Sequence, residues 1–229
     1  MKEKTLVYLV RHAQAEGNFK RVFQGFTDAD ISEIGKKQLE KLAERFRDIE
    51  IDCIYSSPLK RAMKTAEAVG KYHDLPIRID ERLKEINGGE WEGQPWSSFP
   101  EKYPEINDAW ENHPDTFRAI GGESMRDVYN RVSEALLDIV RKNLGKRIAI
   151  VSHGCAIRNM LCFLTYGDLA RLKDVDWCDN TAINLFEFDD TLKCRQLLKN
   201  CNEHLSDDIS TFANQSWWRK DKQNEDHGS

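Results

Sequence analysis

The sequence predicts an α/β fold: a three-layer sandwich with a mostly parallel central sheet, flanking helices and a small helical cap over the site. Two continuous aliphatic runs, Thr5–Val10 and Lys146–Ser152, have the pattern of strands that are buried on both faces. Segments with helical spacing alternate with such strands along the chain. We expect the 229 residues to form one domain, 1–229.

The first third of the chain predicts alternating strands and helices. Apolar positions recur at helical spacing from Ile34 to Phe46, and Ser32 before them has a side chain suited to an N-cap. The expected elements are a strand, a polar loop, a helix, a strand, a helix and a strand, at residues 5–10, 11–30, 32–46, 53–55, 59–72 and 77–83.

The sequence changes character over residues 87–122. This stretch holds four of the six prolines and three of the six tryptophans, without a sustained period, and predicts a mostly helical cap over the site. Afterwards we expect a helix, a strand, a helix, an antiparallel strand pair and a polar C-terminal tail, at residues 123–143, 146–152, 156–164, 182–188 with 192–198, and 217–229.

The composition indicates a soluble globular protein. Hydrophobic residues make up 40% of the chain and charged residues 32%, with a mean hydropathy of -0.66. The net charge is -5 and no basic stripe interleaved with aromatic residues is present, so nucleic acid is not an expected partner. No run reaches the ~20 continuous apolar residues of a membrane span, so we expect no membrane association.

The cysteines and the N-terminus predict a cytoplasmic protein. The six cysteines form no CxxC pair and lie mostly in apolar runs, which favours buried, reduced thiols over disulfides or a zinc cluster. Met1–Thr5 is charged and leads directly into a strand, without the apolar region of a signal peptide.

Two of the predicted buried strands end in a histidine. Arg11-His12 follows Val10, and His153 follows Ser152. Ligands of α/β proteins bind at the carboxyl ends of strands, so these histidines are candidate site residues. The other four histidines, His73, His113, His204 and His227, lack this setting and are expected at the surface or in packing.

A second arginine and a carboxylate complete the candidate site. Arg61 falls in the first turn of the predicted helix 59–72, where its guanidinium and the helix amides both favour an anion, so it pairs with Arg11 as a phosphate clamp. A general acid is needed if a histidine attacks phosphorus and an alkoxide leaves. The residue pattern alone does not rank the carboxylates near the third strand: Asp80, Glu81, Glu85, Glu90 and Glu92.

These residues carry a resemblance to a known family. The run Val10-Arg-His-Ala-Gln-Ala-Glu-Gly-Asn18 resembles the Arg-His-Gly-Glu-(Thr/Ser)-x-x-Asn signature of the histidine phosphatase superfamily, the phosphoglycerate-mutase-like proteins. Further matching pieces follow in family order: Phe23–Asp28, Ile31–Gly35, Tyr55–Glu67, Arg82–Ile86, Trp91–Gly93, Gly121–Ser124 and Val151–Gly154.

The resemblance implies a phosphohistidine mechanism without cofactor or metal. It assigns His12 as the nucleophile and Glu85 as the proton donor and later the base toward water. The groups it implies for binding the phosphoryl oxygens are Arg11, Arg61 and His153, with Asn18 assisting. Gln24 resembles the phosphatase-like members, since mutases tend to have serine or threonine there.

The expected activity is hydrolysis of a small phosphorylated metabolite by a monomer or homodimer. The segment 94–120 is short and lacks the arginine pair with which mutases of this family hold a carboxylate-bearing substrate, so phosphoglycerate mutase is the alternative reading. A metal enzyme built on His12, His153 and Glu85 is disfavoured because the arginines would repel a cation.

The chain departs from the family signature directly after the nucleophile. Ala13 stands for the family glycine, Gln14 for its glutamate and Ala15 for its threonine or serine. We expect an ordinary backbone at Ala13, because alanine with positive φ would cost roughly 1 kcal/mol. These departures motivate a third reading, a non-catalytic protein that binds phosphorylated ligands.

Overall fold

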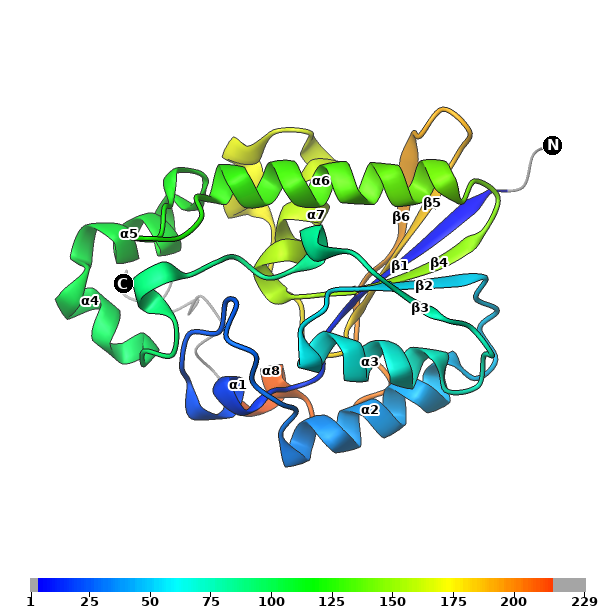
Figure 1. Ribbon diagram of the computed structural model, residues 1–229, viewed down its shortest axis with the longest axis horizontal. Helices are drawn as coiled ribbons and strands as arrows, with labels where there is room; N and C mark the ends of the chain where they lie inside the picture. The colour runs from blue at the N-terminus through cyan, green and yellow to red at the C-terminus, as the bar shows by residue number, and fades with distance from the viewer. Residues whose placement is uncertain (1–3, 216–229) are drawn as a thin grey trace, which may run out of the picture.

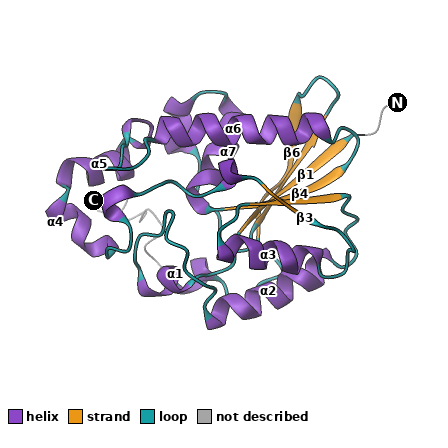
Figure 2. Ribbon diagram, viewed as in Figure 1, coloured by secondary structure: helices purple, strands orange, loops and turns teal. Residues whose placement is uncertain are grey.

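The computed structural model describes residues 4–215, which form a six-stranded sheet between two helical layers (Figures 1 and 2). The strand order is β3-β2-β4-β1-β5-β6, and β3, β2, β4 and β1 run parallel to one another. β5 and β6 are antiparallel. The strands are β1 (Thr5–Arg11), β2 (Cys53–Ser56), β3 (Ile77–Ile79), β4 (Arg147–Ser152), β5 (Ile183–Phe188) and β6 (Cys194–Cys201).

The helices form one layer on each face of the sheet (Figure 1). α2 and α3 pack on one face, and α6 and α7 on the other. The α-helices are α1 (Glu16–Lys20), α2 (Glu33–Phe46), α3 (Lys60–Gly70), α4 (Phe99–Lys102), α5 (Pro104–Asn112), α6 (Met125–Lys142), α7 (Gly154–Tyr166) and α8 (Thr211–Asn214). The 3-10 turns are η1 (Glu81–Leu83), η2 (Gly89–Trp91), η3 (Trp96–Ser98), η4 (Pro114–Thr116) and η5 (Leu169–Asp174). The predicted α/β sandwich with a mostly parallel sheet is confirmed.

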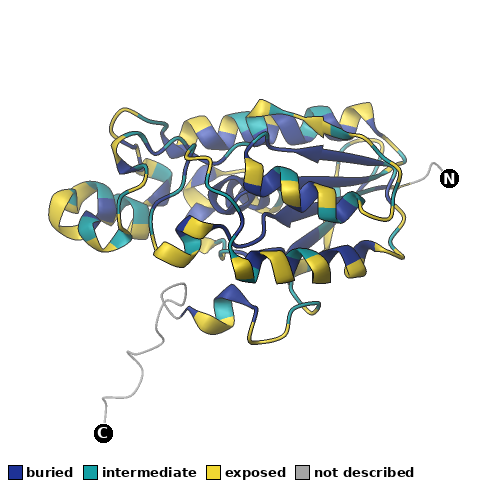
Figure 3. Ribbon diagram, turned by 60° about the horizontal axis from the view of Figure 1, so that its bottom comes forward, coloured by how far each residue is buried: buried dark blue, intermediate teal, exposed yellow. Residues whose placement is uncertain are grey.

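The central strands are buried on both faces, as their aliphatic sequences predict (Figure 3). In β1, Val7 and Leu9 join the hydrophobic cluster under α6 and α7. Tyr8 and Val10 point the other way and join the cluster under α2 and α3. Successive side chains of a strand face opposite sides, so one short strand contributes to both cores and its end is rigidly placed.

The prediction of a third strand over 77–83 is wrong beyond Ile79, where β3 ends. The Asp80 side chain accepts a hydrogen bond from the backbone N–H of Arg82 and begins the 3-10 turn η1. A short aspartate side chain that bonds to the backbone two residues ahead replaces the strand ladder with a turn. The alternation of apolar residues through Leu83 therefore continues without strand geometry.

The predicted cap over 87–122 consists of short helices, in agreement with the sequence. Pro104 and Pro114 lie in the first turns of α5 and η4, where a missing N–H is tolerated. Trp91 stacks on Phe99 with ring centroids 4.0 Å apart. These aromatic rings belong to the same hydrophobic cluster as Leu9 of β1, so the cap shares the core of the sheet.

One helix lies where the sequence predicts a loop: α1 occupies part of the expected polar loop 11–30. The 3-10 turn η5 follows α7 in a stretch for which no element was predicted. The antiparallel pair predicted near 182–198 is confirmed by β5 and β6. The predicted polar tail, 217–229 with His227, lies outside the described residues. Within residues 4–215, no helix is long and apolar enough to cross a membrane.

Candidate active site

The two histidine-bearing strand ends lie side by side in the sheet. β1 pairs with β4 in parallel, with Arg11 opposite Ser152. The backbone N–H of His12 donates to the carbonyl of Ser152 over 2.9 Å. The rings of His12 and His153 therefore meet at the carboxyl end of the sheet, with their centroids 5.1 Å apart.

The ring of His12 is buried and oriented by its own backbone. Its Nδ1 lies 2.7 Å from the carbonyl oxygen of Ala13. A carbonyl only accepts, so Nδ1 carries the proton and Nε2 keeps a lone pair. Burial lowers the pKa of His12 well below its usual range, and the charges of Arg61 and Arg11 lower this pKa further. His12 is thus a neutral base with Nε2 available.

His153 is fully buried beside it. Its Nε2 lies 2.7 Å from the hydroxyl of Ser57, and its Nδ1 has no hydrogen-bond partner among the described residues. Burial, followed by the charge of Arg61, lowers the pKa of His153 well below its usual range. Sequence reasoning missed Ser57, although the residue lies directly after the short strand β2.

Arg61 extends from the first turn of α3 into the same region and is fully buried. Its two terminal nitrogens donate to the carbonyls of Thr27 and Gly25, over 2.7 and 2.8 Å. Its Nε is buried without a partner in the described part of the chain. Burial lowers the pKa of Arg61 to about 10, partly opposed by the charge of Glu85. The guanidinium stays charged at neutral pH.

Arg11, the last residue of β1, is also buried. Its guanidinium donates to the carbonyl of Cys178 and lies against Gly154 at the start of α7. Burial lowers the pKa of Arg11, while the charge of Asp179 opposes that shift. The charges of Arg11 and Arg61 both lower the pKa of His12 and of His153, and the phosphate clamp stays a prediction from the sequence.

Glu85 is the acidic member of the cluster. Its carboxylate accepts three backbone N–H groups over 3.0 Å each, from Ile86 and from Cys155 and Ala156 in the first turn of α7. Burial nevertheless raises the pKa of Glu85, with the amides and Arg61 opposing the shift. A buried carboxyl with a raised pKa keeps its proton to a higher pH than an exposed one, which suits a proton donor.

The competing carboxylates are engaged elsewhere. Asp80 bonds Arg82, and Glu81 pairs with Lys84. Glu90 is exposed in the cap, and Glu92 accepts backbone amides of the loop after Phe23. The geometry thus separates Glu85 from the carboxylates that the residue pattern leaves unranked.

Asn18 and Gln24 occupy a neighbouring unit around α1. The Asn18 side-chain oxygen accepts the backbone N–H of Ala15 over 3.0 Å. The Gln24 side chain packs against Gly17, where an added Cβ would lie 2.2 Å away from it. Gln24 Oε1 is buried without a partner among the described residues. Both residues remain candidates for phosphate binding.

The departures from the family signature fit the structure. Ala13 is absent from the described non-glycine residues with positive φ, so its backbone is ordinary. Gln14 is buried and accepts a hydrogen bond from the Ser32 hydroxyl. The backbone N–H of Ala15 is satisfied by Asn18.

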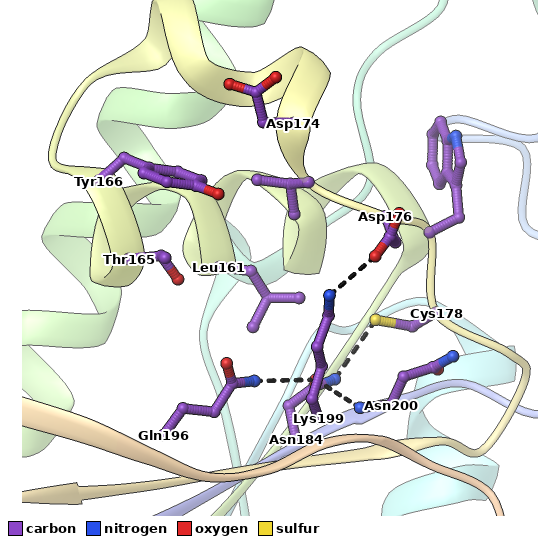
Figure 4. Close-up of a pocket in the computed structure, with 12 residues that line it drawn as sticks. Leu161, Thr165, Tyr166, Asp174, Asp176, Cys178, Asn184, Gln196, Lys199 and Asn200 are labelled. Carbon is purple, nitrogen blue, oxygen red and sulfur yellow. Dashed lines mark hydrogen bonds and ion pairs between the residues drawn. The ribbon is translucent and has the colours of Figure 1, made fainter.

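A cavity lies between α7 and strands β5 and β6, and it adjoins the cluster at Cys178, whose carbonyl binds Arg11 (Figure 4). Lys199 and Asp176 form an ion pair over 2.8 Å at its edge, and the Asn184 amide donates to the Cys178 sulfur. None of the seven predicted site residues lines it. Among the described residues, no three His, Cys, Asp or Glu side chains are placed to share a metal ion.

The fold and the site define an α/β protein in which two histidines, two arginines and a glutamate are buried together at the carboxyl end of the sheet. The model of the histidine phosphatase superfamily (branch 1) matches residues 7–201. The chain belongs to this superfamily.

The proteins with similar sequences and the solved structures with similar folds include phosphatases. The chain is 36% identical over 182 residues to phosphoserine phosphatase 1 of Hydrogenobacter thermophilus, covering 80% of this chain and 86% of the relative. The solved structure of Bacillus stearothermophilus YhfR is similar with a TM-score of 0.83 at 30% identity, covering 87% and 98% of the two chains. A phosphoserine phosphatase mutant from Entamoeba histolytica, solved in complex with phosphoserine, has a TM-score of 0.77 at 27% identity, covering 88% and 100%. The family and these phosphatases support a phosphoric monoester hydrolase.

Proposed function

We propose that the protein is a metal-independent phosphomonoesterase that acts through a phosphohistidine on a small phosphorylated metabolite. In the first step, His12 Nε2 attacks phosphorus with its lone pair. The bond between phosphorus and the ester oxygen breaks, and this oxygen leaves with the electron pair and takes the proton of Glu85. In the second step, the Glu85 carboxylate takes a proton from water. The water oxygen attacks phosphorus, the N–P bond breaks and inorganic phosphate is released.

One observation carries the proposal: two residues of the cluster that contains His12 each have a buried N–H group without a hydrogen-bond partner among the described residues. Arg61 Nε and His153 Nδ1 are buried and make no hydrogen bond in the described part of the chain. Buried donors are normally satisfied, so this pair indicates a ligand with acceptor oxygens. A phosphoryl group supplies such oxygens, and Arg11 adds a second buried positive charge. Asn18 and Gln24 assist from the α1 unit.

The His153 ring can serve as donor while it is neutral. Ser57 Oγ accepts the backbone N–H of Leu59, and its own proton can go to His153 Nε2. That arrangement leaves the proton of His153 on Nδ1. The lowered pKa of this histidine is compatible with a neutral donor toward the phosphoryl oxygens.

Trapping the intermediate tests the mechanism. Quenching without acid after mixing with a ³²P-labelled ester should leave an acid-labile, base-stable label on His12. His12→Ala should lose labelling and turnover together, whereas His73→Ala, at a histidine bonded to the Phe46 carbonyl, should keep both. Label on His153 would reverse the two roles. Hydrolysis of an aryl phosphate that EDTA abolishes and a divalent cation restores would contradict metal independence.

The substrate class follows from chemistry and the relatives together. Phosphoserine is the first candidate, because two phosphoserine phosphatases are among the similar proteins. Turnover across a panel of phosphoserine, sugar phosphates, nucleoside monophosphates and 3-phosphoglycerate tests this choice. Interconversion of phosphoglycerates faster than phosphate release would favour the mutase reading, which the comparisons favour less.

We further propose that residues 1–229 act as one domain in the cytoplasm, as a monomer or homodimer and without nucleic acid. The cap and the sheet share one hydrophobic cluster, which supports the single domain. The net charge of -5 disfavours a polyanionic partner. Sedimentation of the full chain and a nucleic-acid binding assay test these points.

A further inference from the structure

Asn180, which precedes β5, makes a direct contact with the backbone of the candidate nucleophile. The side chain is fully buried, and its Nδ2 donates to the carbonyl oxygen of His12 over 2.8 Å. Because that carbonyl can only accept, the orientation of the Asn180 amide is fixed. No role was predicted for this residue from the sequence.

The bond holds one end of a peptide group whose other end is also held. His12 O and Ala13 N belong to the same planar peptide. Asn180 binds the oxygen, and Thr65 Oγ1 accepts the N–H over 3.0 Å. The next carbonyl, that of Ala13, binds the Nδ1 of the His12 ring. A rotation of the first peptide would therefore shift the ring and move Nε2.

The residues that follow Asn180 are hydrogen-bonded to the end of β1. The N–H of Thr181 donates to the Arg11 carbonyl, and the N–H of Arg11 donates to the Ala182 carbonyl. Thr181 has a φ of 57°, a left-handed conformation that a β-branched residue adopts only under constraint from its surroundings. The turn that carries Asn180 is thus fastened to the end of β1.

A buried carboxylate links this turn to the C-terminal segment. Asp179 is fully buried and accepts the N–H of Asn180 over 2.8 Å. It also accepts the Ser210 hydroxyl over 2.6 Å and the Phe212 N–H over 3.2 Å. The residues before and within α8 therefore hold the turn through Asp179.

We propose that Asn180 is a positioning residue that keeps His12 Nε2 aligned for attack, with Asp179 and the segment 210–212 as its support. The inference rests on the proposed phosphohistidine mechanism and adds a residue to it. Asn180 acts through the His12 peptide. A displacement of a reacting atom by about 1 Å can cost about 10²-fold in rate.

The test compares Asn180→Ala with Asn143→Ala in the full-length protein. Asn143 is likewise buried and donates its amide to a carbonyl, that of Ile139, over 2.8 Å, but it lies at the end of α6. Both variants should lose stability in urea. Asn180→Ala alone should lower the burst rate of phosphorylation by about 10- to 100-fold, with KM changed much less. An unchanged burst rate in Asn180→Ala, or an equal loss in Asn143→Ala, would overturn the positioning role.

The pH profile of Asn180→Asp distinguishes a positioning role from a purely structural one. A carboxylate at this position repels the His12 carbonyl, whereas a protonated carboxyl can donate to it. The burst rate of Asn180→Asp relative to wild type should rise as the pH falls, while that of Asn180→Ala should stay flat. Parallel profiles for the two variants would contradict the inference. If the wild-type protein carries no label on His12, the proposed mechanism and the inference both fail, whereas a labelled wild type with unaffected variants overturns the inference alone.

Discussion

At the scale of single residues, the surroundings of Glu85 make it the proton donor of the proposed reaction. Glu85→Gln keeps an oxygen for the amides of Ile86 and Ala156, which share one carboxylate oxygen, but it loses the acceptor for the amide of Cys155 and cannot give a proton. The burst rate with an alkyl phosphate should fall by about 10²–10⁴-fold, because an alkoxide needs the proton. The burst with p-nitrophenyl phosphate should change far less, because its phenolate leaves as a stable anion.

Rapid-quench kinetics must isolate the first step of that comparison, since Glu85 also activates water in the second step. Glu90→Gln is the matched control, at an exposed carboxylate five residues along the chain. Equal burst losses for both substrates in Glu85→Gln, or a selective alkyl loss in Glu90→Gln, would show that another carboxylate donates the proton.

The sequence predicts the charged and titratable groups of the site better than the groups that hold them. His12 and His153 follow the ends of two strands and Arg61 lies in the first turn of a helix, positions that the periodicity of the sequence predicts. Ser57 and Asn180 contact the two histidines from 96 and 168 positions away in the chain. Such contacts depend on sheet order, which hydrophobic patterns do not specify.

At the scale of elements, the loop that carries Arg61's two carbonyl partners is held from its other side by Glu92. The Glu92 carboxylate accepts the backbone N–H groups of Gly25, Phe26 and Thr27. A hydrogen bond to a charged group contributes about 1.5–3 kcal/mol. Glu92→Gln removes the charge and loosens the loop, so KM for a phosphate ester should rise about ten-fold, with kcat nearly unchanged.

That kinetic pattern has a physical basis. In the proposed mechanism Arg61 binds the phosphoryl oxygens both before and during transfer, and loss of such uniform binding appears in KM. Steady-state kinetics on Glu92→Gln measure the expected rise in KM. Glu90→Gln is the control, because Glu90 lies two residues away and contacts Tyr103 within the cap. A fall in kcat without a rise in KM, or the same effect in both variants, would contradict a role of the loop 25–27 in substrate binding.

Elements with a strong period are predictable, whereas short ones depend on local side-chain bonds. α2 begins after Ser32, whose hydroxyl accepts the Gly35 N–H, as its N-cap position predicts. α1 has five residues and β3 has three, too few to show a period. β3 ends where the Asp80 side chain bonds to the backbone N–H of Arg82, an interaction that the alternation of apolar residues does not predict.

At the scale of the whole molecule, an acidic chain encloses a basic centre. The net charge is -5, yet the candidate site contains two buried arginines beside the buried carboxyl groups of Glu85 and Asp179. In the proposed reaction the two guanidinium groups meet the charge of a single phosphoryl group. The net negative charge of the chain disfavours polyanions.

This burial also makes the stability of the fold depend on pH. The pKa of His12 and of His153 is well below the usual value in the folded state, chiefly through burial. Burial also lowers the pKa of His204 to about 4. As the pH falls below about 6.5, the unfolded chain takes up these protons first. Stability from these groups is present above that pH and is lost on acidification.

Glu85 has the opposite effect on how stability depends on pH. Its pKa is raised, so the folded state keeps a proton that the unfolded chain releases, and stability from this group falls as the pH rises. The three histidines make the free energy of unfolding fall on acidification, and one carboxyl makes it rise. Each proton taken up on unfolding changes this free energy by about 1.4 kcal/mol per pH unit. The free energy of unfolding, measured by urea denaturation, should therefore be lower at pH 5 than at pH 7. Replacing His12 and His153 together by Asn should flatten that dependence, and Glu85→Gln should steepen it. A wild-type protein equally stable at both pH values would contradict the neutral, buried state of the two histidines.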